Sequence, residues 1–411
     1  MRFYLPSYSA LRRESRAMAM GLTISGAGLG MYMNFFLVNI GWNNILMSLA
    51  LLLLPNWKSL LNFRLPCTNR TFGFIIFFQF ICILYMVLGG DIDTKGLIYI
   101  LFTVFMIIGI MSQDFGNMSM TKVVWYAWIF GWICLAFCGI SLASGVFFIE
   151  DYKAHTIKGY DNILVDLTMA GNLYTFIVCC LYYIKSSKVI SKYSVIGIIL
   201  SIVCMLVLGK RTPLIVGGFA IFMFIFKFYP ISRRIKKSSL SYVFYFIALI
   251  LLMIQIPGLS EQIQNVWMRT TGGILDMIYG TSTSGAAAVE RYNLRNWAYD
   301  YIENNFSLLN YFFGAGYMTK WTDSPLLQSY LDMGLIGFGV YLYFVIIKPL
   351  RITFSKLSAN RLIFWGCALN FYNILSSMNS GTPYGHVRWI PLTVLILTII
   401  QSKKSKQNLY A

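Results

Sequence analysis

The chain has 411 residues, of which 58% are hydrophobic and only 12% are charged, and its net charge is +18. This composition excludes an ordinary soluble protein, in which about a quarter of the residues are charged. It also excludes a nucleic-acid-binding protein, because the basic residues lie in short connections beside apolar runs and form no basic domain. The sequence therefore predicts an all-α polytopic integral membrane protein.

The predicted membrane spans follow one another from residue 17 to residue 401. Runs without charge are expected to span, because one charged side chain at the centre of a membrane helix costs about 2.5–3.5 kcal/mol. Several runs approach the roughly 20 residues that cross the hydrocarbon. About twelve spans are predicted: 17–38, 42–55, 72–90, 96–112, 123–149, 163–184, 194–209, 213–229, 241–257, 325–347, 362–378 and 388–401.

Charge is sorted between the two sides of these spans. If the N-terminus is inside and the spans alternate, the inside connections hold 23 of the 33 Lys and Arg residues but only two acids, Glu14 and Asp114. The outside connections then hold 13 of the 15 acids. An inner-membrane protein that obeys the positive-inside rule has this pattern, so both termini are expected in the cytoplasm. No cleavable signal is expected, because 17–38 is long enough to be the first span.

The connections divide the chain into three parts. Residues 1–257 hold spans one to nine, and residues 258–324 form the only sizeable outside loop. Residues 325–411 hold spans ten to twelve and a basic cytoplasmic tail. Within the loop, 286–304 begins with three alanines that follow Gly, Ser and Thr turn residues, and this pattern predicts a helix.

The eight cysteines all lie in predicted spans or in an inside loop. None lies in the large outside loop, where an oxidising compartment could pair them. Cys134 and Cys138 stand one helical turn apart, but no His or acid accompanies them as a further metal ligand. We therefore interpret the cysteines as small apolar packing residues and predict neither a metal nor a cofactor.

Seven cations gather on the outside face, against the topology bias, and so need another explanation. Arg binds phosphate in a bidentate manner and keeps its charge when buried, so a lipid-linked phosphate or pyrophosphate is a natural ligand. Alternatively, these cations are ordinary solvated or acid-paired residues of loops. The seven are Lys210, Arg211, Arg269, Arg291, Arg295, Lys320 and Arg388.

Three of these cations have informative positions. Arg211 lies in a tight turn between two spans, where its guanidinium would stand at the membrane–water boundary. Arg291 and Arg295 stand four residues apart and so share one face of the predicted loop helix. Glu290 and Asp300 could pair with them, in which case this helix is an ordinary salt-bridged surface helix.

The outside face also carries candidate proton acceptors. Asp323 stands just before Pro325, which begins span ten. Its carboxylate either caps that helix or takes a proton from an attacking hydroxyl. His155 and His386 are both outside, and each is a candidate general base because imidazole titrates near neutral pH. Lone loop histidines are, however, usually neither bases nor ligands.

Two further acids, Asp166 and Asp332, lie one or two turns inside predicted spans. Acids inside a membrane are functional candidates by default, although either could simply cap a helix or bond a neighbouring one. The Gly-x-x-Gly-x-Gly pattern at 334–339 is not a nucleotide-binding loop, because it follows no strand. Small residues at helical spacing are usual in packed spans.

Three patterns in the second half of the chain occur in a recognisable order. Residues 209–214 place an Arg in a tight outside turn before an apolar helix, and residues 290–297 combine two Arg residues with a Trp on a predicted helix. A Gly-x-Gly segment at 314–316 then leads into a Leu-rich segment with Gly-Leu-x-Gly at 323–337. In these features the chain resembles the O-antigen polymerase (Wzy) and O-antigen ligase family of bacterial inner-membrane glycosyltransferases.

The resemblance implies roles for particular residues. Asp323 or His386 would orient or deprotonate the acceptor hydroxyl. Ligases of the family typically have a His where this chain has Asp323, and that difference favours a polymerase. Arg211 would be both catalytic and pyrophosphate-binding. The pyrophosphate-binding residues so implied are Arg211, Lys210, Arg291, Arg295 and Arg269.

The resemblance also implies a reaction. A glycosyltransferase similar to the GT-C class would polymerise undecaprenyl-diphosphate-linked oligosaccharide repeat units, as donor and acceptor, on the periplasmic face of the bacterial inner membrane. The product would be lipopolysaccharide O-antigen or a related surface polysaccharide. We expect no metal, because the only outside acid-x-acid motif, at 91–93, lies in a turn too short for a donor domain. Membrane lipids, a chain-length regulator and a flippase would be partners, and nucleic acid would not.

Two alternatives stay open. An O-antigen ligase would carry the same patterns in the same order, although ligases typically have a His at the position of Asp323. A lipid-linked oligosaccharide flippase or other transporter would also suit twelve spans, but a transporter more often places charges near the membrane midplane and keeps its loops short. Here the charges gather at one outside face beside the loop 258–324, which favours an enzyme.

Overall fold

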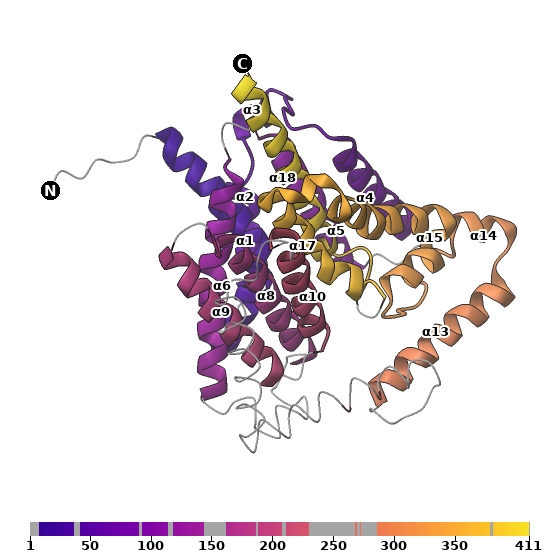
Figure 1. Cartoon of the computed structure of the whole chain (residues 1–411). Helices are drawn as coiled ribbons and strands as arrows, with labels where there is room; N and C mark the ends of the chain where they lie inside the picture. Colours follow the sequence, from indigo (N-terminus) through magenta and orange to yellow (C-terminus); the bar gives the residue numbers. More distant parts are fainter. Residues whose placement is uncertain are drawn as a thin grey trace. The chain divides into compact units, whose positions relative to one another are not determined.

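The computed structural model describes residues 8–36, 42–89, 93–113, 118–143, 162–185, 188–207, 211–229, 268, 272, 286–378 and 381–410, and within them the chain is helical, without strands (Figure 1). The α-helices are α1 (Tyr8–Phe36), α2 (Trp42–Leu53), α3 (Trp57–Leu61), α4 (Arg70–Leu88), α5 (Thr94–Met111), α6 (Met120–Ala143), α8 (Asn162–Tyr183), α9 (Lys188–Val207), α10 (Arg211–Phe228), α13 (Ala286–Asn305), α14 (Leu308–Phe313), α15 (Pro325–Tyr341), α16 (Lys348–Phe354), α17 (Arg361–Ser376) and α18 (His386–Tyr410). A π-helix, η2 (Leu342–Ile347), continues α15, and a 3₁₀-helix, η3 (Lys356–Ala359), follows α16.

The helices overlap with the predicted spans, although α1 begins nine residues before its span and α18 ends nine residues after its span. Each predicted span has its helix except 241–257, which lies outside the described residues. The predicted loop helix is α13, so this expectation is confirmed. Within the described part of the chain, four helical segments are long and apolar enough to cross a membrane: Arg70–Leu88, Met120–Ile140, Lys188–Leu206 and Pro325–Phe354. The chain is therefore a helical membrane protein by composition and helix length.

Helix α4 illustrates how the local sequence determines where a membrane-spanning helix begins and how long it is. Asn69 precedes it with extended backbone, and its side chain accepts a hydrogen bond from the Thr71 amide at 2.8 Å. This bond satisfies one of the free amide groups of the first turn. From Thr71 to Leu88 the helix carries no charge. Its 19 residues extend about 28 Å, close to the thickness of the hydrocarbon.

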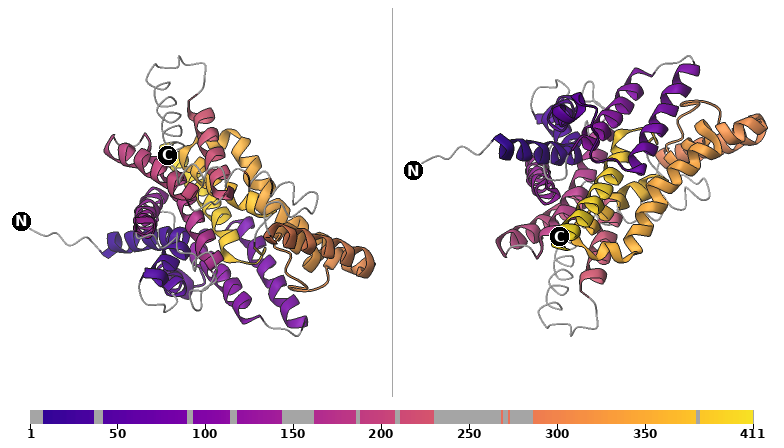
Figure 2. Two further views of the ribbon diagram at one scale, coloured as in Figure 1. Left: turned by 90° about the horizontal axis from the view of Figure 1, so that it is seen from below. Right: turned by 90° about the horizontal axis from the view of Figure 1, so that it is seen from above.

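The chain forms two compact units. The first comprises Met1–Cys134 and Arg295–Ala411, and the second comprises Leu135–Leu294. In the second unit, α8, α9 and α10 pack on one another. In the first, α17 and α18 lie side by side and both contact η2 (Figure 2). These two units are defined by packing contacts. The division of the chain into 1–257, 258–324 and 325–411 is defined by the expected membrane topology and stays a prediction.

At one end of the first unit, the last turn of α4 contacts the end of α14, since the Tyr85 hydroxyl donates to the Phe313 carbonyl at 2.6 Å. There, too, the Leu326 amide at the start of α15 donates to the Ser377 carbonyl after α17 at 3.1 Å. The ring of Tyr99, near the start of α5, lies 5.3 Å from that of His386, the first residue of α18. Each of these three contacts joins helix ends that the sequence analysis assigns to the outside.

The opposite helix ends of the same unit also meet. Lys348 in α16 bonds the Thr71 hydroxyl at the start of α4. Asn360, before α17, donates to the Ser402 hydroxyl in the last part of α18 at 3.1 Å. Gln401 of α18 accepts from the Met120 amide, which begins α6, at 3.0 Å. Each contact joins residues expected on the inside.

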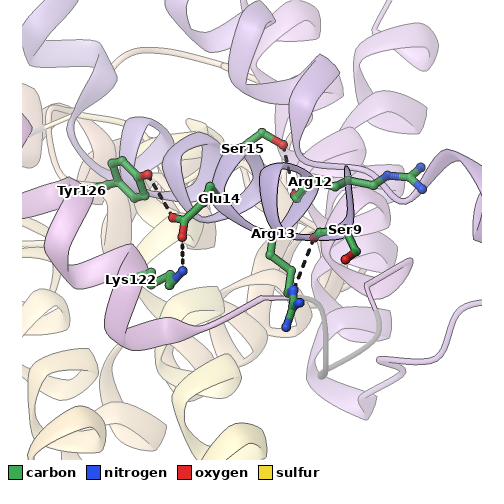
Figure 3. Close-up of polar contacts among 7 residues, drawn as sticks. All are labelled: Ser9, Arg12, Arg13, Glu14, Ser15, Lys122 and Tyr126. Carbon is green, nitrogen blue, oxygen red and sulfur yellow. Dashed lines mark hydrogen bonds and ion pairs between the residues drawn. The ribbon is translucent and has the colours of Figure 1, made fainter. Parts of the chain in front are cut away.

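The first turns of α1 also dock at this end (Figure 3). The Glu14 carboxylate forms an ion pair with Lys122 through one oxygen and accepts from the Tyr126 hydroxyl at 3.0 Å through the other. The hydrogen bond from Lys122 is the main cause that lowers the pKa of Glu14. One of the two acids expected inside therefore ties α1 to α6.

Helix α15 is interrupted at Gly334, a feature that the apolar pattern of 325–347 does not indicate. Gly334 has φ 61° and ψ −158°, a conformation that side chains rarely adopt. A Cβ built there would lie 2.4 Å from the carbonyl carbon of Phe312, the penultimate residue of α14. Gly314 has φ 79°, and its Cβ would lie 2.2 Å from the carbonyl of Asp332. The two glycines let the chain between α14 and α15 fold back onto α15.

Substituting Gly334 with Ala is therefore expected to destabilise the protein. The backbone conformation alone costs about 1–3 kcal/mol for a side-chain-bearing residue, and the overlap with Phe312 adds to it. Gly339→Ala is the matched control, because a Cβ at Gly339 would meet nothing within 4 Å. Thermal unfolding of the purified protein in detergent measures both. Equal midpoints for the two variants would contradict this close approach.

Candidate functional site

Several predicted site residues converge on the chain that joins α17 to α18, residues 377–385, of which 379 and 380 lie outside the described part. Arg295 of α13 donates from Nη2 to the Met378 carbonyl at 3.1 Å. Oδ1 of Asp323 accepts from the Gly381 amide at 2.8 Å. His386 begins α18. Residues from three separate segments of the sequence thus meet at one connection.

Asp323 does not cap α15. Ser324 is the N-cap residue, with no side-chain cap bond, and Asp323 stands one position earlier with φ 50°. The capping interpretation of Asp323 is therefore wrong: Pro325 begins the helix, so the cap position falls on Ser324. A positive φ is costly for a residue with a side chain and is found where surrounding contacts enforce it. In this chain the enforced conformation directs the carboxylate to the α17–α18 connection.

Arg388 lies on the same connection. Its side chain is 9% exposed, and Nη1 donates to the Ser376 hydroxyl. Gly381 has φ 82°, and a Cβ built on it would lie 3.0 Å from Nη2 of Arg388. The Asp323 carboxylate and the Arg388 guanidinium therefore flank the same glycine. A guanidinium and a carboxylate held against the same connection are groups suited to charge that develops during a reaction.

Within the part of the chain that the structure describes, His386 is buried and its ring makes no hydrogen bond. The residue is 8% exposed, and neither ring nitrogen has a partner among the described residues. Its ring lies 5.3 Å from that of Tyr99 and 6.1 Å from that of Phe102, both in α5. Burial lowers the pKa of His386 to about 4, so its imidazole is neutral near pH 7. A neutral ring with a free nitrogen can accept a proton or bind a polar ligand atom.

Asp332 holds the loop that carries Asp323. Its side chain is fully buried, and its two oxygens accept four hydrogen bonds. The donors lie in the loop, on α15 itself and in the α17–α18 connection: the Met318 amide at 3.0 Å, the Thr319 amide at 3.1 Å, Nε2 of Gln328 at 2.8 Å and the Tyr384 hydroxyl. The sequence left open whether Asp332 has a functional role or only bonds neighbouring segments. These contacts favour the second interpretation, with the backbone of the loop as the main partner.

Two tyrosines that the sequence analysis did not identify, Tyr317 and Tyr384, also link the loop to the α17–α18 connection. The ring of Tyr384 lies 4.8 Å from that of Tyr317. Burial, and then the Asp332 carboxylate, raise the pKa of Tyr384, so its phenol stays protonated and donates. A Cβ on Gly96 would lie 2.2 Å from the Tyr317 hydroxyl, so this phenol sits against the first turn of α5. In the sequence, the only indication that Tyr384 belongs to the site is its position two residues before the candidate base His386.

The other predicted residues lie elsewhere or outside the described part. Arg291 is one turn before Arg295 on α13 and belongs to the second unit. Arg211 is the first residue of α10, also in the second unit, whereas the sequence predicted it in the turn before this helix. Nζ of Lys320 stands 4.2 Å from the ring centroid of Trp297. Residues outside the description are Lys210, Arg269 and His155, together with the side chains of Arg211 and Asp166.

All eight cysteines are buried. Cys82, for example, is fully buried, with its sulfur 4.0 Å from that of Met333. This burial agrees with the packing role predicted for them. Within the ranges that the structure covers, no three His, Cys, Asp or Glu residues gather in a way that could hold a metal ion.

Comparison with known proteins adds no relative. A scan against protein-family models finds no match to the chain, and a search among curated proteins finds none either. The family resemblance therefore rests on the order of its three sequence patterns.

Proposed function

We propose that the chain is an O-antigen polymerase-type glycosyltransferase of the bacterial inner membrane. It would join undecaprenyl-diphosphate-linked oligosaccharide repeat units on the periplasmic side. The observation that carries the proposal is the meeting of Asp323, Arg388, Arg295 and a neutral, unpartnered His386 at the α17–α18 connection. Proton acceptors and guanidinium groups are the two kinds of side chain that transfer from a diphosphate-linked donor requires.

The contacts of the first unit support the expected topology. Every contact described at one end joins helix ends that the charge pattern assigns to the outside, such as Tyr85 with Phe313 and Tyr99 with His386. Every contact described at the other end joins ends assigned to the inside, such as Glu14 with Lys122. The contacts therefore agree with the expected alternation of the spans in the first unit, and this agreement supports the proposal of a candidate site on the outside face.

The chemistry assigned to these groups is a substitution at the anomeric carbon of the donor. A hydroxyl of the acceptor sugar attacks that carbon, and its oxygen forms the new glycosidic bond. The bond between the carbon and the diphosphate oxygen breaks, and undecaprenyl diphosphate leaves with the bonding electrons. Asp323 or His386 takes the hydroxyl proton. The role of neutralising the leaving diphosphate is the one that the family resemblance implies for Arg211, with Arg291 or Arg295.

Arg211 has a further feature that suits diphosphate. It begins α10, whose 18 residues direct the positive end of the helix dipole towards the first turn. Free backbone amides of a helix N-terminus bind phosphate, and a guanidinium there adds a bidentate contact. The proposal therefore assigns anchoring of the leaving group to the start of α10.

The proposal is tested by chain growth in detergent. Purified protein with synthetic lipid-linked repeat units is expected to form polymer, Arg211→Ala to form almost none, and Arg211→Lys to recover only part of the rate. Lysine supplies a point charge without the bidentate fork. Lys188→Ala, which removes the first residue of α9 in the same unit, serves as the control and should remain active. Near-normal polymer from Arg211→Ala would refute the role of Arg211.

A transporter is the second candidate, and one observation favours it. Interrupted helices with buried acids form ion and substrate sites in many transporters, and α15 is interrupted at Gly334, two residues after Asp332. Against this reading, the Asp332 carboxylate is already occupied by four protein donors. Polymer formed in detergent indicates an enzyme, whereas activity that requires sealed vesicles indicates a transporter. Transfer of the glycan to a different acceptor lipid would indicate a ligase.

A further inference from the structure

Helix α14 presents an apolar stripe that the rest of the described chain leaves uncovered. Leu308 is 76% exposed, Leu309 70%, Phe312 46% and Phe313 50%. Leu308 and Phe312 stand four residues apart, as do Leu309 and Phe313, so the four side chains share one face. On the other side, Tyr311 packs against Phe306, with ring centroids 5.5 Å apart. The helix is therefore amphipathic, with its apolar face turned away from the protein.

The ends of α14 suit a place with little water. Ser307 and Asn310 form a capping box, in which each side chain bonds the backbone of the other. Nδ2 of Asn310 also donates to the Gly314 carbonyl at 3.0 Å. No charged residue occurs between Glu303 and Lys320. Backbone groups satisfied from within and a charge-free sequence are what a membrane environment requires.

The location of α14 indicates what covers the stripe. The Tyr85 hydroxyl, one turn before the end of α4, donates to the carbonyl of Phe313, the last residue of α14. Helix α4 is long and apolar enough to cross a membrane, so its end marks a membrane–water boundary. Its own outward face is apolar up to that end, with Phe80 61% and Leu88 75% exposed. The stripe of α14 therefore lies next to the end of a helix that exposes apolar side chains to lipid.

We infer that α14 lies in the membrane interface, with its stripe among the lipid acyl chains next to the end of α4. The segment is too short to span, because six residues extend only about 9 Å. It would instead lie along the surface, as interfacial amphipathic helices do. Exposed Trp321, eight residues after α14, adds an aromatic side chain of the type enriched at this depth. Part of the loop 258–324 is then a membrane contact and not a purely aqueous segment.

Lipid is a better occupant than a second copy or a partner protein for two reasons. The stripe carries no charged or hydrogen-bonding side chain with which a protein partner could be specified. The helix that bears the stripe also contacts the end of α4, which exposes apolar side chains to lipid in any case. This inference needs no catalytic activity, so its test stands apart from that of the proposed function.

A nitroxide label on a single introduced cysteine measures the depth of α14 in the intact chain. Leu309→Cys is labelled after reconstitution into lipid nanodiscs, and Glu303→Cys, an exposed position near the end of α13, is the matched control. Because all eight native cysteines are buried, the unsubstituted chain should take up almost no label, and this check replaces a cysteine-free background. The observable is the relaxation of each label by oxygen and by a water-soluble nickel complex.

Oxygen concentrates in lipid and the nickel complex in water. We expect the label at 309 to respond more strongly to oxygen than to nickel, and the label at 303 to show the reverse order. A nickel response at 309 equal to that at 303 would mean that the stripe faces water and would overturn the inference. Protection of 309 from both agents would also overturn it, since a second copy or another protein would then cover the stripe. If labelling perturbs folding at 309, Phe313→Cys on the same stripe gives the same reading.

Discussion

Asp323→Asn is expected to leave the protein folded and to lower the rate of polymer formation about 10²–10⁴-fold. The Asn side-chain oxygen can accept from the Gly381 amide as the Asp oxygen does, so the link between the two loops persists. An amide cannot take up a proton, however, so a role as general base is lost. The substitution thus separates a carboxylate that only holds Gly381 from one that reacts.

The measurement is the initial rate of chain growth in detergent, with thermal unfolding as the check on folding. Asp300→Asn is the matched control, because Asp300 is an exposed acid on α13 in the same loop. If the Asp323→Asn enzyme works at close to the native rate, the carboxylate is only a hydrogen-bond acceptor. His386 is then the remaining candidate base of the described site, and His386→Asn should show the loss instead.

Asp332→Ala is expected to destabilise the protein by more than about 3 kcal/mol. Removing the carboxylate leaves two buried donors and two part-buried donors without an acceptor, and each orphaned buried group costs about 1–3 kcal/mol. The loop that carries Asp323 would lose its attachment to α15, and the α17–α18 connection would lose its attachment through Tyr384. Activity should therefore fall together with stability. Asp332→Asn should be milder, since one oxygen remains as an acceptor.

Thermal unfolding in detergent checks this expectation. Ser329→Ala is the control, because Ser329 is equally buried in α15 but bonds only the Leu326 carbonyl of its own helix. A normal unfolding midpoint for Asp332→Ala, combined with lost activity, would contradict the structural role. It would instead point to direct participation of the acid, as in a proton-coupled transporter.

Helix positions could be predicted from the sequence because apolar composition decides them locally. The runs 72–90 and 362–378 correspond to α4 and α17 within two residues at each end. Membrane helices satisfy their own backbone groups, so the pattern that makes a span also makes a helix. The loop helix α13 was predictable for a similar local reason, its opening alanines.

The contacts of the site could not be predicted, because they join distant parts of the chain. Asp323 and Gly381 are 58 positions apart, and Asp332 and Tyr384 are 52 apart. A single sequence carries no signal for such pairs. Asp323 looked like a helix cap because acids favour that position, and only the backbone showed that Ser324 occupies it. Likewise, a lone loop histidine gives no indication of burial, yet His386 is 8% exposed.

The first unit combines two separate parts of the chain, Met1–Cys134 and Arg295–Ala411, and this has a consequence for biosynthesis. The Tyr85 hydroxyl meets its partner carbonyl at Phe313, 228 positions later in the chain. At a translation rate of about 5–20 residues per second, α4 is in place roughly 10–45 seconds before α14 emerges from the ribosome. The early helices must therefore persist as an incomplete assembly in the lipid. Their final packing is a late event of translation, and a ribosome that stalls within residues 135–294 leaves the N-terminal helices without the partners that complete their unit.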